Sequence, residues 1–510
     1  MQVTANKILT LDELSTKAKE YREAGKKVVL CHGAFDLLHA GHISYLKSAL
    51  REGDVLFVTV TADEFVNKGP GRPIFSQELR MENLSHLNFV DYVAVNHAPT
   101  AVNVLSDVKP YAYVKGPDYK EMEDDITGNI YAEKKAVEAN GGKIVFTNDV
   151  TFSSTSLLNE HFGVFPTETK TYLNSFRQKH SYEEIIGMLQ GLENLNVLVV
   201  GDTIVDEYHY VDPLGQSSKG ANLAVKFVSK EQFAGGSLAV ANHLAGFVNN
   251  VTIVTGLGAQ GSHEEFIRSK LQKNVTFEPY YFPDAPTIVK RRYVDADLLK
   301  LFEVYFYNDE PSLNQIDPEV CSWLGKNTAQ FDLVIVPDFG NGFISQNMIQ
   351  KLCDNARFLA VNTQVNSGNR GYHSINQYPR ADFVSLNGPE LRVATHDRHD
   401  TYENLAKGLL EKIGAKHFAV TLGSGGALLL DKNLKITHKI PILSTKVLDR
   451  IGAGDTFLSL AGLCLGGGLS SEIALFIGSA AAALDVQVVC NRESVTPINL
   501  YKYIKTLLQS

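Results

Sequence analysis

Short runs of β-branched and apolar residues alternate with amphipathic stretches along most of the chain, and no other feature constrains its fold as strongly. Near the N-terminus the predicted strands are residues 28–31, 54–61, 91–96, 111–115 and 143–147. Between them, stretches such as 76–87 and 131–139 have helical periodicity. Strands that are joined through helices form right-handed crossovers. The pattern therefore predicts an α/β fold in which helices cover a parallel sheet.

The alternation is interrupted once, by a polar stretch at residues 160–194 that contains one expected helix near 182–192. A second α/β pattern starts with the strand 196–200 and ends in a helix near Leu508. Because 510 residues exceed what one hydrophobic core usually supports, we expect two three-layer, parallel-sheet domains. The predicted boundaries are 1–160, a linker with a docking helix at 161–194, and 195–510. In the second domain, 223–228, 287–294 and 299–306 lack crossover helices and predict a small antiparallel β lid.

Charge and cysteine usage exclude several classes of protein. A net charge of −9 argues against nucleic-acid and anionic-membrane partners. The five cysteines are widely spaced and include no CxxC pair, which argues against a disulfide framework or a zinc site. The most apolar region, 456–489, is broken by three glycines and carries two carboxylates, so we expect two buried helices there. Residues 10–13 read as a helix capping box rather than a signal peptide. We therefore expect a cytoplasmic protein.

The segment Gly33–His42 directly follows the first predicted strand and opens a helix. At the carboxyl end of a parallel strand, a helix N-terminus offers free N–H groups and a positive dipole end to a phosphate. His39 and His42 flank a glycine and can donate hydrogen bonds to a phosphoryl transition state. A pair of helix-start histidines that bind nothing is the alternative, but the pair together with Gly33 and Gly41 favours a phosphate site.

Residues 27–160 resemble the HxGH nucleotidyltransferases, especially the adenylyltransferase half of the bifunctional ADP-heptose synthases. The resemblance is carried by 33–46, by Arg72-Pro73 with Arg80, by 114–119 and by 153–156. It implies that His39 and His42 are catalytic and stabilise the transferring α-phosphate of ATP or CTP, with Mg²⁺ bridging phosphates. Lys68 is either a further phosphate contact or a solvated loop lysine. The residues implied for nucleotide or phosphate binding are Gly33, Phe35, Asp36, Gly41, Lys68, Lys115, Asp118, Ser154 and Thr155.

In the second domain, Gly452-Ala453-Gly454-Asp455 stands just before the long apolar stretch. Small residues at a helix N-terminus leave backbone N–H groups open to an anion, and a neighbouring carboxylate can take a proton from an attacking hydroxyl. A simple turn before a helix would use the same glycines. A carboxylate beside an anion site is, however, more useful for phosphoryl transfer than for stability.

Residues 196–508 resemble the ribokinase-like (PfkB) sugar kinases, again with the ADP-heptose synthases as the nearest relatives. The resemblance implies that Asp455 is the catalytic base, that Glu390 acts indirectly on Mg²⁺, and that the lid contributes to a homodimer. The residues implied for binding ATP and its phosphates are Asn387, Glu390, Thr421, Gly423, Gly426, Gly452, Ala453 and Gly454. The residues implied for binding the sugar are Asp202, Asp206, Gly235, Gly236, Asn242 and Asp338.

The chain departs from these relatives at several positions. The kinase-like part comes second here and first in the heptose enzymes. Ala239 stands where an Asn is usual, Asn341 where a Lys is usual, and Arg450 where a small residue is usual. Phosphate-side residues are retained and sugar-side residues are changed, which suggests a different acceptor. Residues 256–261 also satisfy GxGxxG, but they do not follow the first strand of their domain, which weakens a dinucleotide-binding interpretation.

We therefore expect a bifunctional transferase that phosphorylates a sugar with ATP and makes an ADP- or CDP-activated, heptose-like sugar for polysaccharide or glycoconjugate synthesis. Its partners would be small sugars and sugar phosphates. The alternative is a working nucleotidyltransferase that carries a catalytically silent kinase-like domain for binding or dimerisation.

Overall fold

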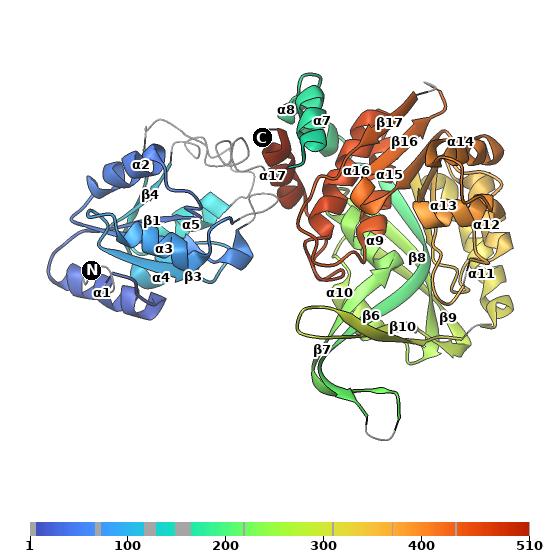
Figure 1. Ribbon diagram of the computed structural model, residues 1–510, viewed down its shortest axis with the longest axis horizontal. Coiled ribbons are helices and arrows are strands. Elements are labelled where there is room, and N and C mark those ends of the chain that lie inside the picture. Colours follow the sequence, from blue (N-terminus) through green and yellow to red (C-terminus); the bar gives the residue numbers. More distant parts are fainter. Residues whose placement is uncertain are drawn as a thin grey trace. The chain divides into compact units, whose positions relative to one another are not determined.

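The computed structural model describes residues 7–66, 73–116, 129–147, 165–217, 220–308, 311–369, 371–433 and 436–508. The chain divides into two compact units, which are treated separately below. The first comprises Met1–Pro166 with Tyr501–Ser510, and the second comprises Thr167–Leu500. Helix α17 (Pro497–Leu508) crosses the division in sequence. The α/β architecture is labelled in Figure 1.

The first unit is built on a parallel sheet, as its strand–helix alternation predicts. The described strands of this sheet have the order β3-β2-β1-β4-β5, and every neighbouring pair is parallel. The predicted strands lie within two residues of those observed. Their bounds are β1 (Val28–Gly33), β2 (Val55–Thr61), β3 (Tyr92–Asn96), β4 (Ala112–Lys115) and β5 (Lys143–Phe146).

Alternating strand residues in the first unit form one hydrophobic core on each face of the sheet. On one face, Val28, Leu30 and Phe57 pack with residues of α1 and α4. On the other, Val29, Cys31 and Val58 pack with residues of α2 and α3. Thr10 and Glu13 form the predicted capping box at the start of α1. The helices and turns are α1 (Leu11–Glu23), α2 (Ala40–Leu50), η1 (Asp63–Phe65), α3 (Gln77–Ser85), α4 (Val102–Val108) and α5 (Asn129–Glu138).

The second unit is organised around one very long strand, β6 (Asn196–Gln216). Its first half lies in the main sheet, parallel to β8 and β12, and its second half continues into a lid. The described strands run β9-β8-β6-β12-β13-β14-β15-β16-β17, with the last two joined antiparallel. The bounds are β8 (Asn250–Gln260), β9 (Val275–Pro286), β12 (Leu333–Asp338), β13 (Leu359–Thr363), β14 (Phe383–Asn387), β15 (His417–Thr421), β16 (Ala427–Asp431) and β17 (Ile436–Ile440).

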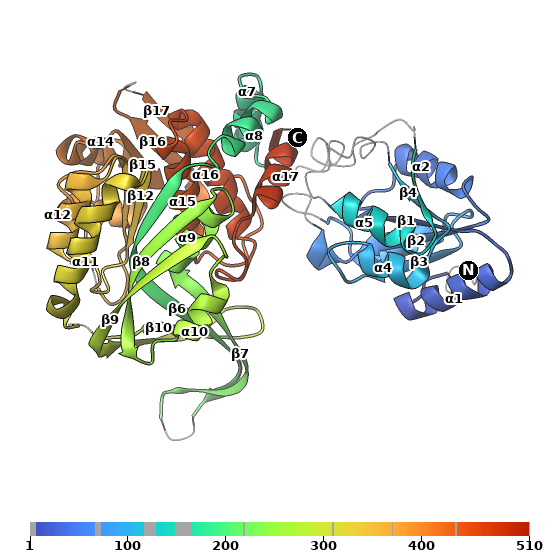
Figure 2. The ribbon, with the colours of Figure 1, turned by 180° about the vertical axis from the view of Figure 1, so that it is seen from behind.

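The lid has four described strands in the order β7-β6-β10-β11. Strand β7 (Leu223–Gly236) is antiparallel to β6, and β10 (Ile288–Val294) is antiparallel to β11 (Lys300–Phe306). Strand β10 runs parallel to β6, which joins the two hairpins. The β6–β7 hairpin projects beyond the rest of this unit in Figure 1 and Figure 2. The three segments predicted as a small antiparallel lid are therefore strands of a lid.

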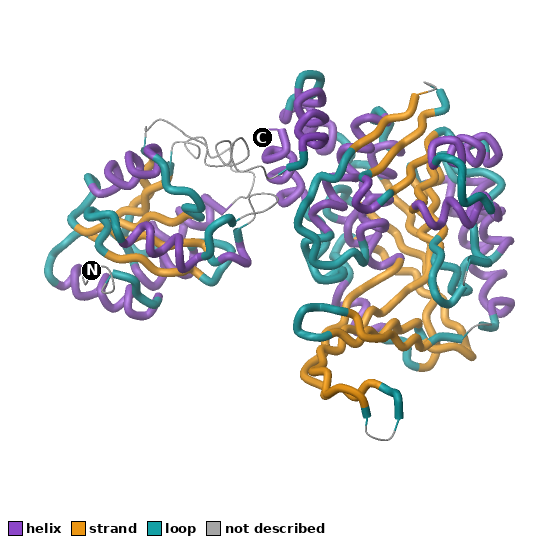
Figure 3. The backbone as a smooth tube through the Cα atoms, viewed as in Figure 1, coloured by secondary structure: helices purple, strands orange, loops and turns teal. Residues whose placement is uncertain are grey.

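Helices cover both faces of the main sheet in the second unit, as the tube in Figure 3 shows. Helices α9, α15 and α16 cover one face, with α15 against β12, β13 and β14, and α11, α12, α13 and α14 lie on the other. The two buried helices expected at 456–489 are α15 and α16. The bounds are α9 (Ser237–Ala245), α10 (Glu264–Lys270), α11 (Leu313–Asn327), η4 (Thr328–Gln330), α12 (Gln346–Asn355), η5 (Ile375–Gln377), α13 (Gly388–Thr395), α14 (Tyr402–Ile413), η6 (Gly423–Gly425), α15 (Ala453–Gly466) and α16 (Ser471–Asp485).

The polar stretch before β6 contains two helices, whereas the sequence predicts one. Helix α7 (Thr167–Arg177) precedes the expected α8 (Tyr182–Gln190). Both belong to the second unit. The ring of Phe176 stacks on Phe476 of α16 at 4.2 Å between centroids, and Thr169 donates to the carbonyl of Ile442. Helix α7 escaped prediction because its first five residues are only Thr, Glu and Lys, so its apolar residues are confined to the second half.

Within the described ranges, no helix has the length and apolarity needed to cross a bilayer. All five cysteines are free thiols, and four of them are buried.

Candidate active sites

The histidine pair of the first unit lies at the start of α2, beyond the carboxyl end of β1. His39 is the N-cap residue of α2, and its Nδ1 accepts a hydrogen bond from the Gly41 N–H at 3.1 Å. The rings of His39 and His42 stack with their centroids 4.0 Å apart. The structure therefore brings the two predicted catalytic side chains together at a helix N-terminus, which is a favourable place for phosphate.

Residues that precede the histidines shape the turn from β1 into α2. Phe35 has a left-handed backbone (φ 49°), and its ring lies 5.3 Å from the His42 ring. The Asp36 carboxylate accepts hydrogen bonds from the backbone N–H groups of Ile74 and Phe75, at 2.8 and 3.0 Å. Asp36 therefore holds a neighbouring loop in place. A Cβ on Gly33 would lie 3.2 Å from the Phe35 ring, so this glycine makes room for the turn.

Lys115 stands at the end of β4, on the same sheet edge as the histidines. Its ammonium lies 3.0 Å from Oε2 of Glu133, a residue of α5. Glu133 also accepts hydrogen bonds from the Tyr113 hydroxyl and the Ala101 N–H, so the ion pair is held within a buried network. Sequence reasoning missed Glu133 because nothing in a helical pattern marks a buried glutamate. Four further predicted residues, Lys68, Asp118, Ser154 and Thr155, lie outside the described residues.

Two basic residues of the first unit, the buried Arg80 and the partly buried His32, make contacts within the fold. Arg80 is fully buried and donates hydrogen bonds to the carbonyls of Ala34, Thr61 and Phe75. It therefore ties α3 to the loop that precedes the histidines. His32, which sequence analysis did not single out, contacts the hydroxyls of Thr59 and Thr61 at 3.0 and 3.3 Å. Burial lowers the pKa of His32 to about 4, so its ring is neutral near pH 7.

Asp455 lies in the first turn of α15 in the second unit, where the sequence places the catalytic base. Its side chain is buried. Burial, together with the negative charges of Asp206 and Glu390, raises the pKa of Asp455, and the nearby Lys290 lowers it, so that it lies at about 7. A carboxyl group with a pKa near the working pH can take and release a proton, as a general base must.

The glycines before Asp455 differ in what surrounds them. Gly452 is the N-cap of α15 and has a left-handed backbone (φ 99°). A Cβ there would come within 2.5 Å of Asn491 Oδ1 and 2.9 Å of Asp485 Oδ2. Gly454, by contrast, has no described atom within 4 Å of the place where a Cβ would be. The position of a Cβ on Gly454 is therefore open, whereas the position of a Cβ on Gly452 is filled.

Asp206 and the double glycine lie at the junction between the main sheet and the lid. Asp206 forms a buried ion pair with Arg292 of β10. A Cβ on Gly235 would lie 2.0 Å from Asp206 Oδ2, and one on Gly236 would lie 2.5 Å from the carbonyl oxygen of Asp202. Glycine is therefore required here for β7 to approach β6, whatever its part in sugar binding.

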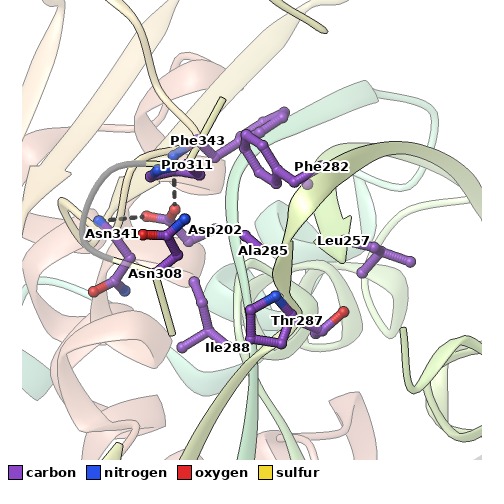
Figure 4. A pocket seen from close by; sticks show the side chains of 12 residues that line it. Asp202, Leu257, Phe282, Ala285, Thr287, Ile288, Asn308, Pro311, Asn341 and Phe343 are labelled. Carbon is purple, nitrogen blue, oxygen red and sulfur yellow. Dashed lines mark hydrogen bonds between the residues drawn. The ribbon is translucent and has the colours of Figure 1, made fainter. Parts of the chain in front are cut away.

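Asp202 lines a pocket beside the lid, which Figure 4 shows with the side chains around it. Its carboxylate accepts hydrogen bonds from the backbone N–H groups of Asn341 and Phe343, at 3.4 and 3.2 Å. Burial, assisted by the negative charge of Asp338, raises the pKa of Asp202 to about 6. The other residues that line the pocket include Gly256, Phe282, Ile288 and Asn308.

Asp338 lies at the end of β12 within a small polar cluster. Its carboxylate lies 3.0 Å from His373 Nε2 and accepts a hydrogen bond from the Tyr378 hydroxyl at 2.6 Å. Burial lowers the pKa of His373, but the hydrogen bond and charge of Asp338 outweigh burial and raise it overall. Sequence analysis missed His373 because it lies in an irregular loop. The Asp338 oxygens are thus largely occupied by protein donors.

Asn387 and Glu390 form a capping box at the start of α13. The Asn387 side chain accepts from the Glu390 N–H, and Glu390 Oε2 accepts from the Asn387 N–H, both at 2.8 Å. Glu390 Oε1 accepts from the Val365 N–H, and burial raises the Glu390 pKa to about 7. The carboxylate oxygens are therefore engaged, so Glu390 suits contact with Mg²⁺ through water and not direct coordination.

The described residues contain no group of three or more His, Cys, Asp or Glu side chains arranged to hold a metal ion. Mg²⁺ commonly retains water and takes most of its ligands from substrate phosphates. The residues present fit such a phosphate-borne ion. They do not form a protein cage.

Three further predictions fall into turns and strands. Thr421 ends β15, and Gly423 and Gly426 have positive φ angles of 56° and 78° in the tight turn before β16.

The amide of Asn242 forms hydrogen bonds with the backbone of Lys270 and Gln272, so the structure does not bring it to the Asp202 pocket. Gly256 and Gly258 lie inside β8, where a Cβ would meet Phe282 or the Pro286–Thr287 backbone. Close packing therefore explains why these two residues are glycines, and a dinucleotide-binding loop is not needed to explain them.

Residues 194–497 match the family described as pfkB family carbohydrate kinase. This match covers more than half of the chain and includes the Asp455 site. The chain belongs to the pfkB family of carbohydrate kinases. Residues 30–160, which contain the histidine pair, match the cytidylyltransferase-like family. Both families consist of transferases, and the chain is a transferase in which a pfkB kinase domain follows a cytidylyltransferase-like domain.

Curated relatives of this pfkB-family chain share its nucleotidyltransferase part. The bifunctional protein HldE of Aeromonas hydrophila is 41% identical over 157 residues, which are 30% of this chain and 32% of that protein. HldE of Pseudomonas fluorescens is 39% identical over 155 residues, which are 30% and 31% of the two chains. The matched segment thus spans about a third of these relatives.

Solved structures of sugar kinases align with the pfkB part. Ribokinase from Thermotoga maritima is 20% identical with a TM-score of 0.48, over 61% of this chain and 99% of that one. Phosphofructokinase-2 from Escherichia coli is 16% identical with a TM-score of 0.49, over 61% and 99% of the two chains.

Proposed function

We propose that the chain is a bifunctional enzyme that phosphorylates a sugar with ATP and joins a sugar phosphate to a nucleotide, yielding an ADP- or CDP-sugar. The observation that carries the proposal is that each unit places its predicted reactive group at a helix N-terminus. His39 and His42 stack at the start of α2, and Asp455 is buried in the first turn of α15. Backbone N–H groups at both places can bind phosphate oxygens.

In the kinase reaction, Asp455 accepts the proton of the acceptor hydroxyl while that oxygen forms a bond to the γ-phosphorus of ATP. The bond between the γ-phosphorus and the bridging oxygen breaks, and ADP leaves. The N–H groups near Gly452 and Gly454 stabilise the charge on the transferring group. Mg²⁺ would supply charge neutralisation when it is bound with the nucleotide phosphates, and Glu390 would act on it indirectly, through water.

In the nucleotidyl transfer, an oxygen of the sugar phosphate attacks the α-phosphorus of the nucleoside triphosphate, and pyrophosphate leaves. His39 and His42 donate hydrogen bonds to the α-phosphate oxygens as their charge grows. Lys115, held by Glu133, adds a positive charge at the same sheet edge. The nucleotide is ATP or CTP, and the product would serve polysaccharide or glycoconjugate synthesis.

The test is an assay of the full chain for pyrophosphate release, with each nucleoside triphosphate offered against a panel of sugar 1-phosphates. ADP release is measured in parallel with ATP and a panel of sugars and sugar phosphates. We expect heptose 7-phosphate not to be the preferred kinase acceptor, because Asn341 and Ala239 replace the usual Lys and Asn. Absence of sugar-dependent ADP release with every acceptor would instead support a silent kinase-like domain that binds ligand without turnover.

The lid supports a further element of the proposal, a homodimer. Four apolar residues near the tip of the β6–β7 hairpin are exposed: Leu214, Leu223, Phe227 and Val228. Apolar surface of this kind is typical of protein interfaces. Light scattering on the full chain and on a Phe227→Lys variant would test whether this hairpin holds two copies together.

A further inference from the structure

Three consecutive basic residues, Lys290, Arg291 and Arg292, lie on the lid strand β10 but have different partners. Arg291 pairs with Glu207 at 2.6 Å, and Arg292 pairs with both Asp206 and Glu303. Lys290 is buried, yet among the described residues its ammonium has no carboxylate within ion-pair distance and no hydrogen-bond acceptor. Of these three cations, only Lys290 has N–H donors that remain available to a ligand.

The surroundings of Lys290 place it at the kinase site. The carboxylates of Asp202 and Asp206 on β6, and of Asp455 on α15, are close enough to act on its charge. Its Nζ lies 5.6 Å from the ring centroids of both Tyr305 and Phe339, so two aromatic faces flank it. Ile288, two residues earlier and on the same face of β10, lines the Asp202 pocket.

Burial of Lys290 leaves its ammonium little access to water, and among the described residues no acceptor replaces the hydrogen bonds that it loses, which is unfavourable. Aromatic faces attract a cation but do not accept three strong hydrogen bonds. Phosphoryl oxygens would satisfy these donors, and a dianionic group would offset the charge in a site otherwise lined by carboxylates.

We propose that Lys290 binds the phosphoryl group at the kinase site, so that the lid supplies a cation opposite the N–H groups of α15. This inference rests on the kinase activity proposed above. Lys290 would donate hydrogen bonds to the oxygens of the γ-phosphoryl group as it passes from ADP to the acceptor oxygen. An acceptor's own phosphate is a second source of the same chemistry, and the experiment separates the two.

The experiment compares full-length wild type with Lys290→Met, which keeps the length of the side chain and its contacts with the rings. Lys226→Met is the matched control, because Lys226 is an exposed lysine on the lid strand β7. We expect Lys290→Met to lower kcat about a hundredfold, with KM for ATP changed only a few fold, as for loss of one preorganised transition-state donor. The control should retain the wild-type kcat.

Acceptor choice identifies the source of the phosphoryl group. Equal loss of kcat with phosphorylated and unphosphorylated acceptors assigns Lys290 to the transferring group. Loss confined to phosphorylated acceptors assigns it to the acceptor's phosphate. In Lys290→Met, the acidic limb of the pH profile of kcat should also move to higher pH. Removal of a cation beside Asp455, Asp206 and Asp202 raises the pKa of Asp455, the base.

Anion binding gives a readout that does not depend on turnover. Millimolar orthophosphate should raise the Tm of wild type and Lys226→Met more than that of Lys290→Met, and Lys290→Gln should behave as Lys290→Met does. If no acceptor supports turnover in wild type, the proposed function fails. The difference in the Tm shift caused by orthophosphate then decides by itself whether Lys290 binds a phosphoryl anion. Equal kcat and equal Tm shifts in all variants would overturn the inference.

Discussion

At the scale of single residues, both candidate sites use side chains that also affect the stability of the fold. His39 caps α2 through its ring nitrogen while it faces His42. Asp455 occupies a buried position that makes its charged form costly. The His39 cap therefore favours the fold and the charge of Asp455 opposes it, so substitutions must be chosen that separate the effect on stability from the effect on activity.

The histidine pair can be tested with variants that preserve the cap. His39→Ala should lower pyrophosphate formation about a hundredfold, the usual scale for losing one transition-state donor. It should also destabilise the first unit by about 1 kcal/mol, because α2 loses its N-cap. His39→Asn keeps a capping side chain and should lose activity with little change in Tm. Full activity of His39→Asn or His42→Asn would remove these histidines from the mechanism.

The raised pKa of Asp455 predicts opposite effects on activity and stability. Kinase kcat should rise as pH increases through about 7, because the base must be unprotonated. Since folding raises this pKa, the stability contributed by the protonated form is lost as pH rises towards that value. Asp455→Asn should therefore abolish ADP formation but raise Tm at about pH 8, with a gain that vanishes near about pH 4.

Asp449 provides the control of opposite sign. Burial raises its pKa, but the Tyr208 hydroxyl and Lys300 outweigh burial and lower it overall. Its charged form therefore stabilises the fold, and Asp449→Asn should lower Tm at neutral pH. A lower Tm for Asp455→Asn at about pH 8 would contradict the inference that the buried charge of Asp455 destabilises the folded state.

At the scale of elements, the start of α15 determines whether the second unit can bind an anion. The helix begins at Ala453, and its N-cap Gly452 adopts a left-handed backbone beside Asn491 and Asp485. At Gly454, in the first turn of the helix, the position that a Cβ would occupy is open. Gly452 is therefore required by its backbone conformation and close neighbours, whereas nothing in the described structure around Gly454 excludes a side chain.

These two glycines give a matched test. Gly452→Ala should cost about 1–3 kcal/mol of stability, because the backbone is strained and the Cβ meets two oxygen atoms. Gly454→Ala should leave Tm unchanged or slightly higher, because alanine favours helix and meets no described atom. If Gly454→Ala folds normally but loses ADP formation, the open space beside it is where the phosphoryl group binds. Equal stability of the two variants would contradict the strain assigned to Gly452.

At the scale of the whole molecule, the two families in one chain predict two separable reactions. Each proposed site is built from residues of its own unit. In the full chain, His42→Asn should abolish pyrophosphate release and leave sugar-dependent ADP release intact, and Asp455→Asn should do the reverse. Measurement of both products for both variants gives the answer. Loss of both activities in either single variant would show that the reactions are coupled.

Most strands and helices, and the α/β class of each unit, could be predicted from the sequence alone, because hydrophobic periodicity and glycine-rich turns are local signals; helix α7 was the exception. Strands 28–31 and 111–115, the capping box at Thr10 and the helix pair in 456–489 are all observed. The motifs also located His39, His42 and Asp455 at helix starts. Such features depend on residues near one another in the chain, so they can be read without knowing the fold.

Only the tertiary structure decided which distant residues become partners. Glu133 meets Lys115 and His373 meets Asp338 across gaps that no local pattern spans. The three basic residues of β10 look equivalent in sequence, yet β6 and β11 supply carboxylates to Arg291 and Arg292 and leave Lys290 among aromatic rings. Burial and pairing depend on strand register and packing between layers, and these fix the charge and the free donors of each side chain.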